Sequence, residues 1–268
     1  MDYSPFISSV LSEASEIAMN NFGKIQGTTK EGDNNQVLTE TDLAVGRHIV
    51  GKIKEQYPAH NIIDEEAGVI DNHSEYTWVI DPIDGTSNFA NASPLFAIIV
   101  GLLYQNHPVA GGMALPYFEE TYLAEKGKGA FLNGKQIHVS SEENMLKMLI
   151  SYNVDGFQNN PEKTEIESRI LKEIILNCRN LRSSGSMLDC MFLARGTYGG
   201  AHHRNTNIWD VVGTQIIVEE AGGVFTNFNG EPLDYKEHLK KAKENFPFCA
   251  GTPKLHKKLQ EIIHKYID

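Results

Sequence analysis

The chain has 268 residues, of which 41% are hydrophobic and 22% are charged. This composition excludes a disordered or fibrous protein and allows one large domain, or two domains that share a core. Asp and Glu number 35 against 24 Lys and Arg, and the resulting formal charge of −11 disfavours binding to the phosphate backbone of a nucleic acid.

Two helices are predicted near the start of the chain. Ser4 and Pro5 are typical of an N-cap and a first helical residue, and apolar side chains then recur at helical spacing as far as Gly23. A polar stretch over residues 27–36 separates this helix from a second one, which stops near Pro58.

Two short apolar segments are each followed directly by acidic residues. Segment 61–63 precedes Asp64, Glu65 and Glu66, and segment 78–80 precedes Asp81 and Asp84. Strands that end in carboxylates bring them together at one edge of a sheet. Because Pro82 has no N–H to donate, we expect the chain to turn directly after Asp81 and to let Asp81 and Asp84 converge.

The predicted secondary structure changes near the middle of the chain. Residues 96–139 are β-rich, with hairpin signals at Gly111-Gly112, Gly127 to Gly129 and Asn133-Gly134. Helical periodicity then returns in 165–176, 187–194, 211–220 and 253–266, separated by short strands such as 223–226. We therefore expect a mixed α/β fold: an α+β half over 1–145 and an α/β half over 146–268 that completes the site, in a single compact unit.

Five oxygen donors are candidates for a metal site: Glu65, Asp81, the carbonyl of Ile83, Asp84 and Asp210, which opens a predicted helix. Hard oxygen donors suit Mg²⁺ better than zinc, and this number is enough for two or three ions. Taken singly, each acid is as well explained by a turn, a helix cap or a solvated pair. Their repeated position after a buried segment favours a functional site.

The expected compartment is the cytoplasm. Cys178, Cys190 and Cys249 are odd in number and widely spaced, which fits neither a disulfide framework nor a thiolate zinc site. The first residues lack a signal-peptide pattern, and no apolar run approaches the ~18 residues of a membrane span. We expect no membrane partner.

Two longer motifs resemble signatures of the inositol monophosphatase family. Residues 78–89, WVIDPIDGTSNF, resemble the first signature, and 209–213 with 220–223 resemble the second. Glu65-Glu66, 127–134 and 184–186 fall where the family has its metal glutamate, a hairpin and a substrate loop. The resemblance covers nearly the whole chain.

The resemblance implies a layered α/β/α/β/α sandwich of the sugar-phosphatase type, which hydrolyses a small phosphate monoester, such as inositol monophosphate, with Mg²⁺. It also implies sensitivity to lithium and a homodimer. Carried over by position, one Mg²⁺ uses Glu65, Asp81 and the Ile83 carbonyl, and a second uses Asp81, Asp84 and Asp210. A weaker third ion lies beside Glu65.

The same resemblance implies roles for the neighbouring residues. A metal-activated water, oriented by Thr86 with Asp42 and Glu66 close by, attacks phosphorus. The backbone N–H groups of Gly85 and Thr86 hold the phosphate. The remaining substrate-binding positions are Ser184, Gly185, Ser186, His203 and Arg204.

One position departs from the family pattern. Members that act on inositol phosphate carry an acid where this chain has His203, followed by Arg204. These side chains donate hydrogen bonds, so either they favour a substrate with a second anionic group, such as NADP, a sugar bisphosphate or a nucleotide bisphosphate, or they face solvent. Asp189 is an alternative acceptor, and Lys30 is an uncertain match to a substrate-side lysine.

Two other kinds of function remain open at this stage. A non-catalytic regulator that binds protein or RNA would be favoured by a degenerate metal site, whereas every expected ligand is present here. A domain that uses the metal only for stability would lose its fold together with the ion.

Overall fold

The computed structural model describes residues 2–24, 27–29, 37–157 and 159–267. The α-helices are α1 (Ser4–Asn21), α2 (Glu40–Gln56), α3 (Thr86–Ala90), α4 (Pro161–Asn177), α5 (Leu188–Ala194), α6 (Ile208–Glu220) and α7 (Pro253–Ile267). Short 3₁₀ helices lie at η1 (Pro116–Phe118) and η2 (Met145–Lys147). Among these described residues, no helix has the length and apolar character needed to cross a membrane.

The larger sheet has eight strands in the order β10-β9-β8-β7-β6-β5-β3-β4. Their bounds are β3 (Asn61–Asp64), β4 (Gly68–Ile70), β5 (Tyr76–Asp84), β6 (Ala97–Tyr104), β7 (His107–Leu115), β8 (Glu120–Glu125), β9 (Gly129–Leu132) and β10 (Lys135–Ile137). Strands β5 to β10 form antiparallel neighbours, as the hairpin signals predict, whereas β3 and β5 run parallel. Parallel pairing places the ends of β3 and β5 side by side.

The smaller sheet has five strands in the order β12-β11-β13-β15-β14. Their bounds are β11 (Leu149–Asn153), β12 (Asn180–Arg182), β13 (Tyr198–His203), β14 (Val224–Thr226) and β15 (Phe248–Gly251). The strands β1 (Thr28–Thr29) and β2 (Val37–Leu38) form a separate antiparallel pair. All strands of the smaller sheet follow residue 148, and all strands of the larger sheet precede residue 138.

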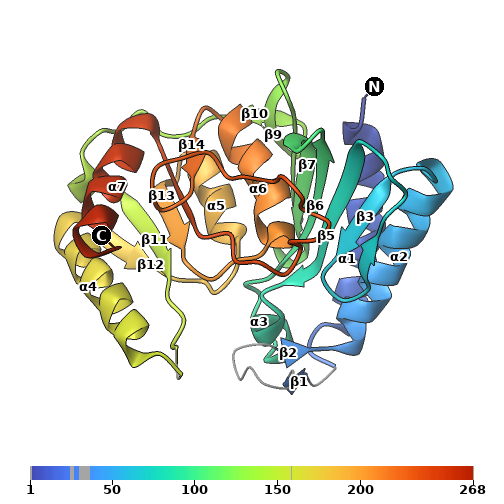
Figure 1. Cartoon of the computed structure of the whole chain (residues 1–268), viewed down its shortest axis with the longest axis horizontal. Coiled ribbons are helices and arrows are strands. Elements are labelled where there is room, and N and C mark those ends of the chain that lie inside the picture. The colour runs from blue at the N-terminus through green and yellow to red at the C-terminus, as the bar shows by residue number, and fades with distance from the viewer. Residues whose placement is uncertain (1, 25–26, 30–36, 158, 268) are drawn as a thin grey trace.

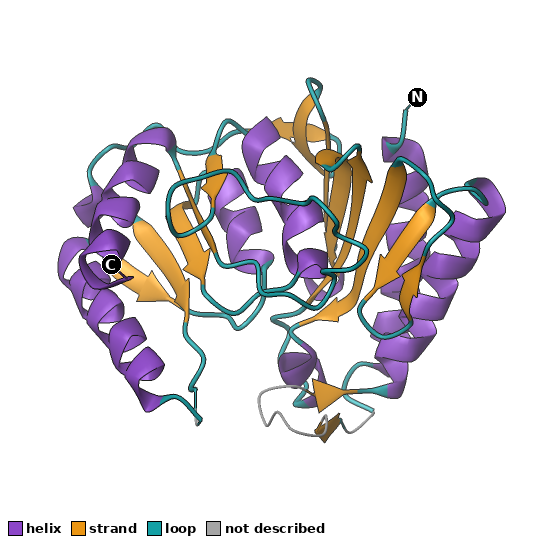
Figure 2. Ribbon diagram, in the orientation of Figure 1, coloured by secondary structure: helices purple, strands orange, loops and turns teal. Residues whose placement is uncertain are grey.

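Five layers alternate across the molecule (Figures 1 and 2). Helices α1 and α2 cover one face of the larger sheet, and α5 and α6 lie between the two sheets. Helices α4 and α7 cover the outer face of the smaller sheet. Three apolar cores fill the four interfaces between the layers, and the central one covers both sides of the α5 and α6 layer. This arrangement is the expected α/β/α/β/α sandwich.

Helix α6 lies unusually close to the larger sheet. A Cβ atom added to Gly101 of β6 would lie 2.7 Å from the backbone nitrogen of Gly213 in α6, which is too close for any side chain. Glycines at both positions therefore let the helix backbone rest directly on the sheet. This contact brings the first turn of α6, which carries Asp210, to the ends of β3 and β5.

Two local predictions need correction. Ser4 is the first residue of α1 rather than its N-cap, and the acceptor for its N–H is Glu125 of β8, at 2.6 Å. Pro82 does not end its strand, because β5 continues to Asp84 through a β-bulge. The bulge takes up one extra residue against β6, so the missing N–H of Pro82 breaks no regular pairing.

Candidate metal and phosphate site

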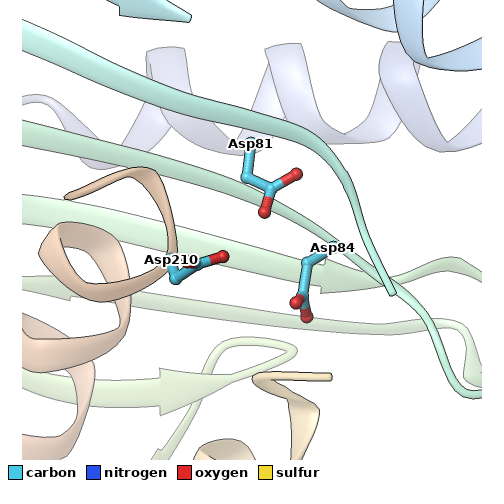
Figure 3. A group of neighbouring side chains, drawn as sticks. All are labelled: Asp81, Asp84 and Asp210. Atoms are coloured by element: carbon cyan, nitrogen blue, oxygen red, sulfur yellow. The ribbon is translucent and has the colours of Figure 1, made fainter. Parts of the chain in front are cut away.

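Three carboxylates converge where β5 meets the start of α6. Asp81 and Asp84 project from β5, and Asp210 projects from the first turn of α6 toward the same point (Figure 3). One oxygen from each carboxylate lies within 4.8 Å of the others. Glu65 follows β3 and lines the same cavity, and its backbone N–H donates to the Ile80 carbonyl on the adjacent strand at 3.2 Å. The parallel pairing of β3 and β5 thus completes an acidic cluster.

Burial and mutual repulsion disfavour the fully ionised form of these carboxylates. Burial, together with the charges of Glu65, Asp210 and Asp84, raises the pKa of Asp81 well above its usual value. Burial also raises the pKa of Asp210, and it raises that of Asp84 to about 7. Buried carboxylates are stable when a cation or hydrogen bonds compensate them.

The donor set fits a hard divalent cation. Oδ1 of Asp81 is buried and has no hydrogen-bond partner among the described residues. No lysine or arginine is present in the described lining of the cavity to balance the acids. All ligands offered by the cluster are oxygen atoms, which is the preference of Mg²⁺.

Asp84 is held by the C-terminal half of the chain. Its Oδ2 accepts hydrogen bonds from the hydroxyl of Ser186 and from the backbone N–H of Met187, the latter at 2.7 Å. Ser186 therefore acts on the cluster by orienting Asp84. Ser184 stabilises the same loop, because its carbonyl accepts a hydrogen bond from Asn88 Nδ2 at 2.8 Å.

Thr86, Asp42 and the Ile83 carbonyl form a second group beside the acids. The hydroxyl of Thr86 lies 3.0 Å from Oδ1 of Asp42 and 2.8 Å from the carbonyl oxygen of Ile83. Asp42 occupies the N3 position of α2, where its Oδ2 accepts from the backbone N–H of Thr39 at 2.9 Å in a capping box. One carboxylate thus caps a helix and orients the threonine.

Gly85 turns the chain from β5 into α3. Its φ of 83° lies in the left-handed region, which glycine adopts without strain. A Cβ atom at this position would lie 3.0 Å from the carbonyl oxygen of Leu95. The turn leaves the backbone N–H groups at the start of α3 beside the acidic cluster.

These residues line a cavity of about 170 Å³. Nine of its lining residues were singled out in the sequence: Glu65, Asp81, Ile83, Asp84, Gly85, Thr86, Gly185, His203 and Asp210. The others are Ser87, Asp155, Asn205, Asn207 and Trp209. Asp42, Glu66, Ser184, Ser186 and Arg204 are not part of this described lining.

Arg204 and Asp189 are engaged elsewhere. Arg204 pairs with Glu167, a residue of α4 that is 1% exposed, and its guanidinium lies 5.0 Å from the ring centre of Phe228. Asp189 is buried and accepts a hydrogen bond from the hydroxyl of Ser151 at 2.5 Å. The structure brings neither side chain to the cavity. Lys30 lies outside the described residues.

Comparison with known proteins identifies the family. The inositol monophosphatase family profile matches residues 3–268. The chain belongs to the inositol monophosphatase family. It is 30% identical over 256 residues to the fructose-1,6-bisphosphatase/inositol-1-monophosphatase of Aquifex aeolicus, covering 94% of this chain and 92% of the relative.

Other members extend the comparison. The chain is 29% identical to the Nus factor SuhB of Pseudomonas aeruginosa over 90% of this chain and 87% of that protein. The solved structure of an inositol monophosphatase from Thermotoga maritima superimposes with a TM-score of 0.86 at 26% identity, covering 100% of this chain and 98% of that one. Membership of the inositol monophosphatase family places the chain among the phosphoric monoester hydrolases, as the sequence motifs predict.

Sequence reasoning gave no separate role to two acids at or beside this inositol monophosphatase site. Asp155 lines the cavity and lies 2.9 Å from Nε2 of His203, but it belongs to no motif and follows β11 without a distinctive pattern. Asp64 received no separate role, yet its Oδ1 accepts from the backbone N–H groups of Glu66 and Ala67, at 3.0 and 2.6 Å. An acid whose side chain accepts from backbone N–H groups two and three residues later is a recognisable turn signal.

Proposed function

We propose that this protein hydrolyses a small phosphate monoester with Mg²⁺, and that an inositol monophosphate is the first substrate to test. The observation that carries the proposal is the convergence of Asp81, Asp84 and Asp210 on one point. A buried oxygen of Asp81 also has no hydrogen-bond partner among the residues that the structure describes. Relatives that are named inositol monophosphatases support the choice of substrate.

Two groups of residues are proposed to hold the ions. Glu65, Asp81 and the Ile83 carbonyl hold one Mg²⁺, Asp81, Asp84 and Asp210 hold a second, and a weaker third lies beside Glu65. When bound, Mg²⁺ supplies a Lewis acid that lowers the pKa of a water molecule and offsets charge on the leaving oxygen. The high density of carboxylates in the cavity supports this assignment.

Thr86 is proposed to orient the attacking water. Its hydroxyl has a single proton, which Asp42 or the Ile83 carbonyl can accept. The lone pairs of the hydroxyl are then free to accept a hydrogen bond from a water beside the phosphate. Glu66, which follows the proposed metal ligand Glu65 in sequence, is proposed to assist it. The N–H groups of Gly85 and Thr86 are proposed to hold phosphate oxygens.

The experiment is a panel of phosphate-release assays with and without Mg²⁺. The panel contains inositol monophosphates, NADP, fructose 1,6-bisphosphate and adenosine bisphosphate, and the Asp84→Asn protein is the control. Release that requires Mg²⁺ and disappears in the control supports the proposal and names the leaving group. A panel without release from any substrate contradicts it.

The regulator hypothesis has one supporting observation, the relative that carries the name Nus factor SuhB. The complete set of acidic residues and the formal charge of −11 favour catalysis for this chain. An RNA-binding regulator predicts measurable affinity for RNA at moderate salt and no metal-dependent phosphate release. The assay panel and a binding titration separate the two functions.

The resemblance also predicts lithium inhibition and a homodimer, and the number and spacing of the cysteines predict a cytoplasmic protein. Lithium chloride added to the phosphate-release assay tests the first prediction. Light scattering tests the second, and localisation of the tagged protein tests the third.

A further inference from the structure

One side of the cavity presents polar groups that have no assigned role in phosphate hydrolysis. Strands β11 and β13 run parallel, with Asn153 opposite His203. This register brings Asp155, two residues beyond β11, beside the end of β13. The side chains of His203 and Asp155 are 15% and 28% exposed, and both line the cavity together with Asn205.

Asp155 is held as an ionised hydrogen-bond acceptor. Its Oδ2 lies 2.9 Å from Nε2 of His203. Burial raises the pKa of Asp155, but hydrogen bonds from His203 and Asn205 and the charge of His203 outweigh burial and lower the pKa below its usual value. A carboxylate offers about four acceptor sites, so these contacts leave capacity for another donor.

The charge around Asp155 does not suit a second phosphate. The described lining contains no lysine or arginine, and the guanidinium of Arg204, which follows His203 in sequence, is paired with buried Glu167. The charges of His203 and Lys163 already compensate Asp155 itself. A second phosphate there would add negative charge without a further cation from the described lining. A hydroxyl group would instead find a strong acceptor.

We propose that Asp155, positioned by His203, accepts a hydrogen bond from a hydroxyl of the leaving alcohol. The site thereby selects monophosphates of polyhydroxy alcohols over esters that lack such a hydroxyl and over substrates with a second phosphate. This inference rests on the proposed phosphatase function. It assigns the acceptor role to Asp155, which lies 48 residues before His203 in the sequence.

The first experiment compares two substrates. We measure kcat/KM for inositol 1-phosphate and for p-nitrophenyl phosphate, whose leaving group has no other hydroxyl, in the Mg²⁺-loaded wild type and in Asp155→Ala. The variant is expected to lower the ratio of the two values about 10- to 100-fold, the effect of one hydrogen bond to a charged group. The matched control is Asp71→Ala, because Asp71 lies 3.4 Å from His73 in an exposed pair and is not in the cavity lining.

The second experiment tests whether His203 positions Asp155. His203→Gln keeps an N–H donor for Asp155, whereas His203→Ala removes it. His203→Ala is expected to lower the substrate ratio, mainly through KM for inositol 1-phosphate, and His203→Gln to restore part of it. In the double variant of Asp155 and His203 to alanine, the ratio is expected to be no lower than in Asp155→Ala, because both residues serve one hydrogen bond.

The results separate failure of this inference from failure of the proposed function. Absence of Mg²⁺-dependent release from either substrate in the wild type overturns the proposed function and the inference together. An active wild type in which Asp155→Ala lowers both values equally, or leaves the ratio unchanged, overturns the inference alone. So does a wild-type preference for fructose 1,6-bisphosphate over inositol 1-phosphate. Thermal unfolding of each variant verifies that it is folded.

Discussion

Asp84 connects two parts of the chain that are far apart in sequence. Its side chain contributes to the acidic cluster, while Ser186 and Met187 donate hydrogen bonds to its Oδ2. Burial raises its pKa from the ordinary value of 3.8 to about 7. Near neutral pH, a proton and a cation therefore compete for this buried carboxylate.

Asp84→Asn is expected to fold normally and to lose phosphatase activity by about 100-fold or more, because it removes a proposed metal ligand but keeps the side-chain shape. The amide oxygen can still accept from Ser186 and Met187. Steady-state phosphate release and circular dichroism check the two parts of the prediction. Full activity in this variant refutes the metal assignment.

Glu167 and Arg204 form a buried ion pair behind His203. Glu167 is 1% exposed and also accepts a hydrogen bond from the hydroxyl of Tyr152. Glu167→Gln is expected to lower the free energy of unfolding by about 3–5 kcal/mol, since it leaves Arg204 partly buried without its counter-charge. Denaturant unfolding measures this change.

The same helix provides a matched control. Glu165 pairs with Arg169 at 3.1 Å, and both side chains are at least 60% exposed. Glu165→Gln is expected to change the free energy of unfolding by less than about 0.5 kcal/mol, because solvent screens an exposed pair. Equal effects of the two substitutions would contradict the assigned importance of the buried pair.

At the level of elements, the site depends on where strands and helices end. Strands β3 and β5 are parallel, so Glu65 and Asp81 emerge at the same edge of the larger sheet. The bulge at Pro82 advances Asp84 toward the cluster, and the first turn of α6 adds Asp210. Local patterns predicted the end of β3 and the start of α6, because strand ends and helix caps have short-range signals. The end of β5 was predicted wrongly, since the strand continues past Pro82 to Asp84.

The N-terminus of α1 relies on a distant residue instead. Oε1 of Glu125, which is 5% exposed, accepts from the N–H groups of Tyr3 and Ser4 at 2.6 Å, and Oε2 pairs with Lys128 at 2.5 Å. Although burial raises the pKa of Glu125, these partners outweigh burial and lower the pKa to about 2.

Glu125→Gln is expected to destabilise the protein by about 1–3 kcal/mol near neutral pH, through the lost charge-assisted cap of α1. The folded-state pKa lies below the unfolded value of about 4.5, so this contribution is fully present above that pH and is lost as pH falls toward about 2. Unfolding of both proteins across this range measures it. A difference that grows as pH falls would contradict the prediction.

Across the whole molecule, the cavity lies where the two halves of the chain meet. The larger sheet supplies Asp81 and Asp84, whereas α6 and β13 supply Asp210 and His203. The buried acids lower the stability of the folded protein until a cation compensates their charge. Removal of metal is therefore expected to change the thermal stability of the protein without unfolding it.

Metal removal by a chelator is expected to lower Tm by about 5–10 °C near pH 8, and by much less near pH 5, relative to one fixed Mg²⁺ concentration of about 100 times the Kd at pH 8. Asp84 has a pKa raised to about 7 in the fold, so the metal-free protein loses stability as pH rises from about 4 to about 7. Scanning calorimetry with and without Mg²⁺ checks this. An equal shift at both pH values contradicts it, and complete unfolding by the chelator favours a structural metal.

The sequence by itself determined the parts of this protein that depend on neighbouring residues. It predicted the acid-terminated strands, the helix start at Asp210 and the hairpin at Asn133-Gly134, where both residues adopt positive φ. The motif resemblance, confirmed by the family match, also supplied the order of the layers. These features follow from spacing, backbone preference and long signatures.

Only the tertiary structure decided which side chains meet across the molecule. It turned Arg204 toward Glu167, paired His203 with Asp155 and assigned Glu125 to the start of α1. Neighbouring residues in sequence do not specify such partners, because each contact depends on how distant strands and helices pack. The residues of the acidic cluster could therefore be predicted from the sequence, whereas the pairing of Asp155 with His203 required the folded chain.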